Sequence, residues 1–218
     1  MGNDVSEDFT SAFEKIKDEV INFHYYWIIF KQFFATNQSR IEIINKTTPS
    51  VFLIIFELLK DYITLETSKL TDPAQSGPYK NLSLLYLHNY LKDKIEKTTF
   101  NELEKILNDL ISASKIFRNR RNKLVSHLDL RTSLDESLKS SLSFFVKDVE
   151  NVLKLLSNYI NTIDFYLNNA ETLFEQFIIS DDDNVEDLLI RLAKSLAYDD
   201  LVKKGLIERK LWKEFGTV

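Results

Sequence analysis

The chain of 218 residues carries 28 lysines and arginines against 33 aspartates and glutamates, which gives a formal net charge of −5. It contains no cysteine, which excludes disulfide scaffolds, thiol catalysis and thiolate metal sites. Apolar residues make up 44% of the sequence, and only four glycines and three prolines interrupt it. So few turn-forming residues favour long helices. We therefore expect an all-α fold, a bundle of long antiparallel helices with additional short helices, in a single domain over residues 1–218. Its core would lie at about residues 6–170, with a helical extension at about 181–218.

Nothing in the sequence indicates a membrane protein. The longest apolar run, residues 51–56, is far shorter than the roughly 20 residues that span a bilayer. The first residues lack the basic and apolar regions of a signal peptide. We therefore expect no membrane association and a cytoplasmic location.

The first half of the chain predicts three helices. Apolar residues recur at steps of four and three along residues 6–36, which predicts one helix about 45 Å long with an aromatic core face. Asn37 is a typical helix start and predicts a short helix to residue 46. Thr48 followed by Pro49 predicts a further helix to residue 70. The aromatic core face consists of Phe9, Phe13, Ile16, Val20, Phe23, Trp27, Phe30 and Phe34.

The second half begins with the only strong cluster of turn residues, at 71–81, which predicts a surface loop. Thr99 with Glu102 three residues later predicts a capping box at the start of a long helix. The tail from residue 203 is expected to pack loosely, and no segment alternates with the period of two that strands require. The remaining helices are expected at about residues 83–91, 99–128, 142–167 and 181–196.

The most informative stretch lies towards the end of the helix predicted at 99–128. Residues 115–123 contain five basic side chains and no acidic one, and His127, one of three histidines, follows them. Arg121 occupies a position of the apolar stripe where a leucine is expected. A guanidinium there is costly unless an anion meets it, and Glu66 is a candidate partner because it interrupts the apolar face of its own helix.

An arginine beside a histidine has a definite chemical use. The planar guanidinium matches a phosphate, and a histidine moves protons near neutral pH. Together they suffice, without a metal, for attack of a ribose 2′-hydroxyl on the neighbouring phosphate. On an ideal helix Arg120 lies on the side of His127 and Arg121 lies about 120° away, so either arginine could hold the phosphate. The plainer alternative is a helix end whose cations complement the negative end of the dipole.

Residues 121–129 resemble the signature of the HEPN superfamily, in which an arginine is followed by a polar residue and, a few positions on, by a histidine. The histidine-x-aspartate ending is similar to the AbiU-type branch, which is linked to bacterial abortive infection. The blocks at 68–73, 81–84 and 187–189 are similar to the same branch, so the resemblance covers roughly residues 9–196.

The resemblance implies a helical bundle, usually dimeric, in which the motifs of both subunits face one cleft. Many members are metal-independent ribonucleases, and others are inactive modules. Carried over, Arg121 would hold the scissile phosphate, His127 would act as acid or base, and Asn122 would position the phosphate or the histidine. We infer that Asp129 orients His127. Arg120 is the reserve for Arg121, and the supporting basic residues are Lys123 and Arg118.

These expectations lead to a dimeric ribonuclease that acts as a toxin or phage-defence effector, with an antitoxin protein as a possible partner. RNA is expected as the substrate because the reaction uses the 2′-hydroxyl. One alternative is a non-catalytic module that binds a nucleotide, RNA or a protein. Another is a purely structural dimer, which a packed His127 and an Arg121 paired with a buried carboxylate would favour. We expect no cofactor and no metal, because His24 and His88 lack ligand spacing, and His24 is expected to pack in the core.

Overall fold

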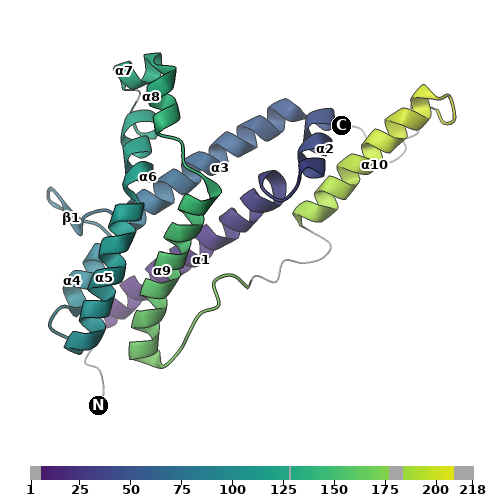
Figure 1. The fold of residues 1–218 in the computed structure, drawn as a ribbon. Coiled ribbons are helices and arrows are strands. Elements are labelled where there is room, and N and C mark those ends of the chain that lie inside the picture. Colours follow the sequence, from purple (N-terminus) through teal and green to yellow (C-terminus); the bar gives the residue numbers. More distant parts are fainter. Residues whose placement is uncertain (1–5, 128, 177–183, 209–218) are drawn as a thin grey trace. The chain divides into compact units, whose positions relative to one another are not determined.

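The computed structural model describes residues 6–127, 129–176 and 184–208. The regular secondary structure of these residues is helical apart from one short hairpin, which confirms the predicted all-α class (Figure 1). They form two compact units, one from residues 6–27 and 58–176 and the other from residues 28–57 and 184–208. A single domain with a C-terminal extension stays a prediction. In the described part of the chain, no helix is both long and apolar enough to cross a bilayer.

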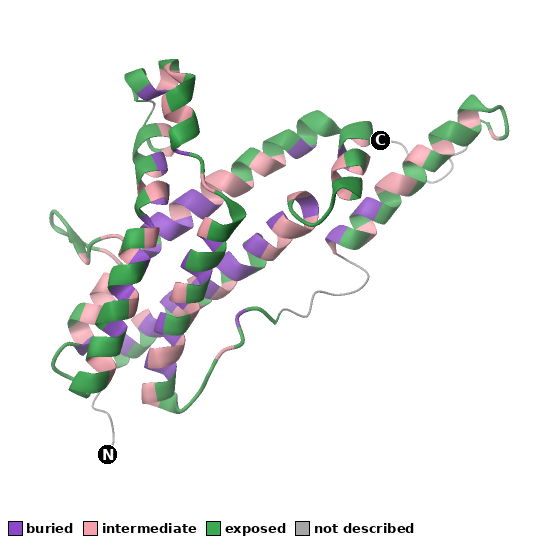
Figure 2. Ribbon diagram, viewed as in Figure 1, coloured by how far each residue is buried: buried purple, intermediate pink, exposed green. Residues whose placement is uncertain are grey.

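The first unit contains part of α1 (Glu7–Phe34) and of α3 (Pro49–Leu70), together with α4 (Leu84–Leu91), α5 (Lys97–Ala113) and α9 (Val146–Asn168). Helices α5 and α9 lie side by side, and each is buried along one side and exposed along the other (Figure 2). Each large apolar side chain contributes about 1.5–3 kcal/mol when it is fully buried. The residues of the predicted aromatic face of α1 from Phe9 to Phe30 are buried, as expected of core residues, whereas Phe34 is half-buried. Fully buried members of this core include Phe9, Phe13, Phe23, Leu84, Leu103, Leu110, Leu156 and Tyr159.

The second unit packs α2 (Gln38–Thr47) and α10 (Val185–Lys203) around an apolar cluster. The predicted start of α2 is confirmed, because the Asn37 side chain accepts a hydrogen bond of 3.0 Å from the Arg40 N–H. Asn184 caps α10 in the same way. The acidic run before it and the tail after residue 208 lie outside the described residues. The cluster consists of Phe33, Ile44, Phe52, Val185 and Leu189.

The turn cluster after α3 contains a hairpin that the sequence pattern did not predict. Strand β1 (Gln75–Ser76) pairs antiparallel with β2 (Tyr79–Lys80), and Gly77 between them adopts a φ of 58°. Glycine adopts this left-handed conformation without a steric penalty. Strands of two residues are too short to show an alternating pattern.

The predicted long helix at 99–128 is in fact three consecutive elements. Helix α5 begins at Lys97, before the predicted cap, and a break at Ser114 separates it from α6 (Lys115–Arg120). The buried Ser114 hydroxyl donates to the Leu110 carbonyl at 2.7 Å, a bond that commonly bends helices. A π-helical turn, η1 (Arg121–Val125), follows directly. Such wide turns are rare and are often found at functional sites.

Two short helices precede α9 where the sequence predicted only a polar break. Asp129 caps α7 (Leu130–Leu134) and Asp135 caps α8 (Glu136–Ser141), each through a carboxylate oxygen that accepts a backbone N–H. A helix of five or six residues is too short to produce a recognisable apolar periodicity in the sequence. Helix α9 begins at Val146, so the residues before it that were expected on its apolar face lie outside the helix.

His88 on α4 makes stability depend on pH. Its Nδ1 lies 3.2 Å from the hydroxyl of the fully buried Tyr159, and its ring stacks on Phe100. Burial lowers the pKa of His88 below its ordinary value of 6.5, although Glu104 opposes the shift. The unfolded state therefore binds more protons than the folded state as the pH falls through about 6.5, and the free energy of unfolding decreases.

We expect the wild type to lose more stability between pH 7 and pH 5.5 than the His88→Gln variant, as measured by urea denaturation at both pH values. The variant lacks the group whose pKa differs between the two states, whereas His24 and His127 are common to both proteins. Equal losses in the two proteins would contradict the assignment.

Candidate functional site

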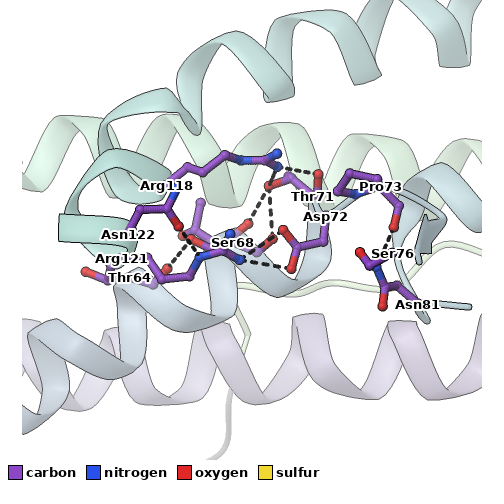
Figure 3. A network of polar contacts seen from close by, with 11 residues as sticks. Thr64, Ser68, Thr71, Asp72, Pro73, Ser76, Asn81, Arg118, Arg121 and Asn122 are labelled. Carbon is purple, nitrogen blue, oxygen red and sulfur yellow. Dashed lines mark hydrogen bonds and ion pairs between the residues drawn. The ribbon is translucent and has the colours of Figure 1, made fainter. Parts of the chain in front are cut away.

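The basic segment from Lys115 to His127 is anchored on the C-terminal end of α3 (Figure 3). The Arg118 guanidinium donates to the carbonyl oxygen of Thr71 and, at 3.0 Å, to its hydroxyl oxygen. Thr71 is buried, and its own hydroxyl donates to the Thr67 carbonyl at 2.8 Å. A cation at a helix C-terminus satisfies carbonyls that the helix leaves unpaired. Arg118 therefore binds α6 to the end of α3.

Arg121, one turn later, pairs with the residue after Thr71. Its Nη1 lies 2.9 Å from both carboxylate oxygens of Asp72, and its Nε donates to Asn122 Oδ1 at 3.1 Å (Figure 3). Asp72, and not Glu66, is thus the anion that meets this guanidinium, because Glu66 accepts from Lys69. The Arg121 side chain is 21% exposed, and its Nη2 makes no hydrogen bond with a described residue. Two neighbours therefore hold the guanidinium in place.

The Arg120 side chain contacts a different part of α3. It is buried, and its Nη2 lies 3.2 Å from Asp61 Oδ1 near the middle of α3. The partners of Arg120 and Arg121, Asp61 and Asp72, are separated by about three helical turns of sequence. The two guanidiniums therefore serve different parts of α3, although Arg120 and Arg121 are neighbours in the chain.

His127 follows the π-helical turn, which ends with a hydrogen bond of 2.8 Å from the Ser126 N–H to the Arg121 carbonyl. The His127 side chain is exposed and makes no hydrogen bond with a described residue. The Asp129 carboxylate caps α7 by accepting the Thr132 N–H at 2.8 Å. Hydrogen bonds from Thr132 lower the pKa of Asp129. Orientation of His127 by Asp129 stays a prediction.

The other predicted site residues, Asn122 and Lys123, are exposed. The side-chain oxygen of Asn122 accepts a hydrogen bond from Nε of Arg121, the residue that is predicted to hold the phosphate. The Lys123 carbonyl accepts a hydrogen bond of 3.1 Å from the Asp129 N–H, which links the π-helical turn to the cap of α7. Within the residues that the structure describes, no group of three or more histidine or acidic side chains could hold a metal ion.

Comparison with protein families agrees with this arrangement. The model of the AbiU2 family of HEPN proteins matches residues 6–188. The chain belongs to this family. Membership suggests a HEPN module related to abortive infection. Searches of the curated proteins and of the solved structures find no significant match.

In this AbiU2 protein the matched region includes three residues whose roles sequence reasoning missed: Thr71, Asp72 and Asn81. The Asn81 amide donates to the Pro73 carbonyl at 2.7 Å and to the Ser76 hydroxyl at 2.8 Å, so it closes the loop that presents Asp72 (Figure 3). The sequence blocks containing Asp72 and Asn81 were recognised by resemblance alone. Asp72 and Arg121 are 49 positions apart, and a single sequence carries no signal for such a pair.

Proposed function

We propose that this AbiU2 protein is a metal-independent endoribonuclease that acts in the cytoplasm as a toxin or phage-defence effector. The observation that supports it best is the partly exposed guanidinium of Arg121, which Asp72 and Asn122 hold in place. An exposed histidine follows on the same segment. Cleavage by the 2′-hydroxyl requires a preorganised cation and a proton-transfer group that act on one phosphate.

In this proposal Arg121 stabilises the charge that develops on the phosphate. His127 takes the proton from the attacking 2′-hydroxyl or gives one to the departing 5′ oxygen, and a cyclic phosphate remains on the product. Asn122 has its oxygen turned to Arg121, so its amide hydrogens are the part left to reach a phosphate oxygen. A homodimer would supply a second copy of the motif, and an antitoxin protein would restrain the activity.

The buried position of Arg120 supports Arg121 as the phosphate ligand. Arg120 would have to leave Asp61 and the protein interior to reach RNA. Arg121 is partly exposed already. Arg118 and Lys123 add positive charge around the segment, so RNA binding should weaken as the salt concentration rises.

One observation favours a non-catalytic role, a purely structural one above all, as the second candidate. Arg118, Arg120 and Arg121 each bond to a group of the same chain. The same contacts would be expected if these arginines served only to hold α6 against α3. The exposed His127, however, is not packed in the way that a structural role would favour.

The test is cleavage of RNA by the wild type in EDTA, with the product ends identified. We expect cyclic phosphate ends, and we expect His127→Ala to reduce the cleavage rate by about 10²–10⁴-fold because general acid–base catalysis contributes that much. The neighbouring exposed Ser126→Ala is the matched control and should cleave as the wild type does. Circular dichroism should show both variants folded.

No cleavage of any RNA by the wild type, or equal rates for His127→Ala and Ser126→Ala, would count against the enzyme. If the same proteins then bound RNA without cleaving it, the non-catalytic binding module would be supported.

A further inference from the structure

A cavity of about 700 Å³ lies at the end of the α5–α9 pair that is remote from the basic segment. Its walls come from the first half of α5, from the last turns of α9 and from the loop after α9. The basic segment follows the other end of α5. The volume is in the range of sites that bind small molecules. The lining residues that matter below are Glu102, Ile106, Phe165, Tyr166 and Glu171.

The wall formed by the loop after α9 is fixed in place. Asn169 ends the helix in the left-handed conformation, with a φ of 51°. The Asn161 side chain then donates to the Thr172 carbonyl at 3.1 Å and accepts the Thr172 N–H at 2.9 Å, as a strand neighbour would. Further on, Phe174 is buried and stacks against His24. Glu171 therefore stands on a segment that is pinned on both sides.

The cavity is acidic. Glu102 on α5 and Glu171 in the loop are exposed, and neither forms an ion pair with a described residue. None of the lining residues is basic. The positive start of α5 and the negative end of α9 both adjoin the cavity, so their dipoles oppose each other and the two carboxylates set the charge. Because α5 begins at Lys97, Glu102 does not serve the capping box that its sequence suggested.

Apolar and aromatic side chains line the cavity together with the two carboxylates. Phe165 is 64% exposed, unusual for a phenylalanine, and Ile106 and Tyr166 also line the cavity. An aromatic ring face attracts an ammonium group, and methylene groups pack favourably on such side chains. A phosphate-bearing ligand would be repelled by both glutamates.

We propose that this cavity binds an aliphatic polyamine. One ammonium group pairs with Glu102 and another with Glu171, and the methylene chain between them lies on Ile106 and Phe165. Two carboxylates from different elements select a ligand with two separated charges over one with a single charge. The site is distinct from the RNA-cleaving segment and does not depend on the function proposed for it.

The experiment is calorimetric titration of the full chain with spermidine at moderate salt. We expect saturable binding that weakens about tenfold in Glu102→Gln and in Glu171→Gln, because each change removes a charged hydrogen bond. Phe165→Leu should weaken binding about twofold to fivefold. Glu104→Gln is the matched control: it makes the same charge change on the same helix outside the lining, and it should bind as the wild type does.

Two results would overturn the proposal. The first is spermidine binding that is as strong in Glu102→Gln and Glu171→Gln as in Glu104→Gln, because binding would then be general attraction to an acidic protein. The second is a capped lysine amide that binds as tightly as spermidine, because a single ammonium group would then suffice and a protein side chain would be the better ligand. Circular dichroism should show that each variant is folded, so that differences in binding reflect the site.

Discussion

Replacing Arg121 with alanine is expected to reduce RNA cleavage at least about a hundredfold, as the loss of one preorganised donor to a developing oxyanion does in other enzymes. The guanidinium is held by Asp72 and Asn122 before any RNA arrives, so little reorganisation is needed when the phosphate binds. The measurement is the single-turnover cleavage rate in EDTA, which excludes product release and metal-dependent contaminants.

The same substitution also removes an ion pair, so it requires a control that separates catalysis from structure. Asp72→Asn weakens the pair and leaves the guanidinium in the protein. We expect the two variants to lose similar amounts of stability and Asp72→Asn to retain much more of the cleavage. If Asp72→Asn lost as much activity as Arg121→Ala, the contribution of Arg121 would be the fastening of η1 to α3.

Arg120→Ala completes this set. Arg120 is buried against Asp61, so its removal should lower stability and leave the cleavage rate of the folded protein nearly unchanged. Loss of cleavage in Arg120→Ala together with an active Arg121→Ala would transfer the phosphate-holding role to Arg120.

The contact between Arg121 and Asp72 joins two distant blocks of sequence. One block ends α3 and presents Asp72 on a loop closed by Asn81, and the other carries Arg118 and Arg121. The end of α3 and the residue after it supply acceptors for both arginines. The blocks are therefore two halves of one contact, which a substitution in either half would break.

The helices could be predicted where the physical signal is local. The aromatic face of α1, the cap at Asn37 and the helix start at Pro49 depend on residues within one or two turns of each other. The break at Ser114 and the π-helical turn after it could not be predicted, because a serine on an apolar stripe is compatible with a continuous helix. The partner of Arg121 was misplaced for a related reason. Glu66 satisfied the pattern of its own helix, whereas Asp72 lay in a loop to which no pattern applies.

Replacing Lys17 with methionine is expected to lower the free energy of unfolding by about 3–5 kcal/mol, the cost of leaving a buried charge without its partner. Lys17 Nζ on α1 lies 2.6 Å from Asp164 Oδ2 on α9, and the Asp164 side chain is only 1% exposed. Asn168 donates to the other carboxylate oxygen at 2.8 Å, which is insufficient for a carboxylate removed from water. Urea denaturation monitored by circular dichroism measures the loss.

Lys15→Met is the matched control for this prediction. Lys15 is on the same helix and forms an exposed pair with Glu19 at 3.2 Å, and such pairs contribute no more than about 1 kcal/mol. The double variant Lys17→Met with Asp164→Leu should regain much of the lost stability, because two apolar side chains replace a buried ion pair without leaving a charge behind. A Lys17→Met protein no less stable than Lys15→Met would mean that water reaches Asp164. In that case the pair would fasten α1 to α9 only weakly, and the aromatic face of α1 would account for nearly all of that packing.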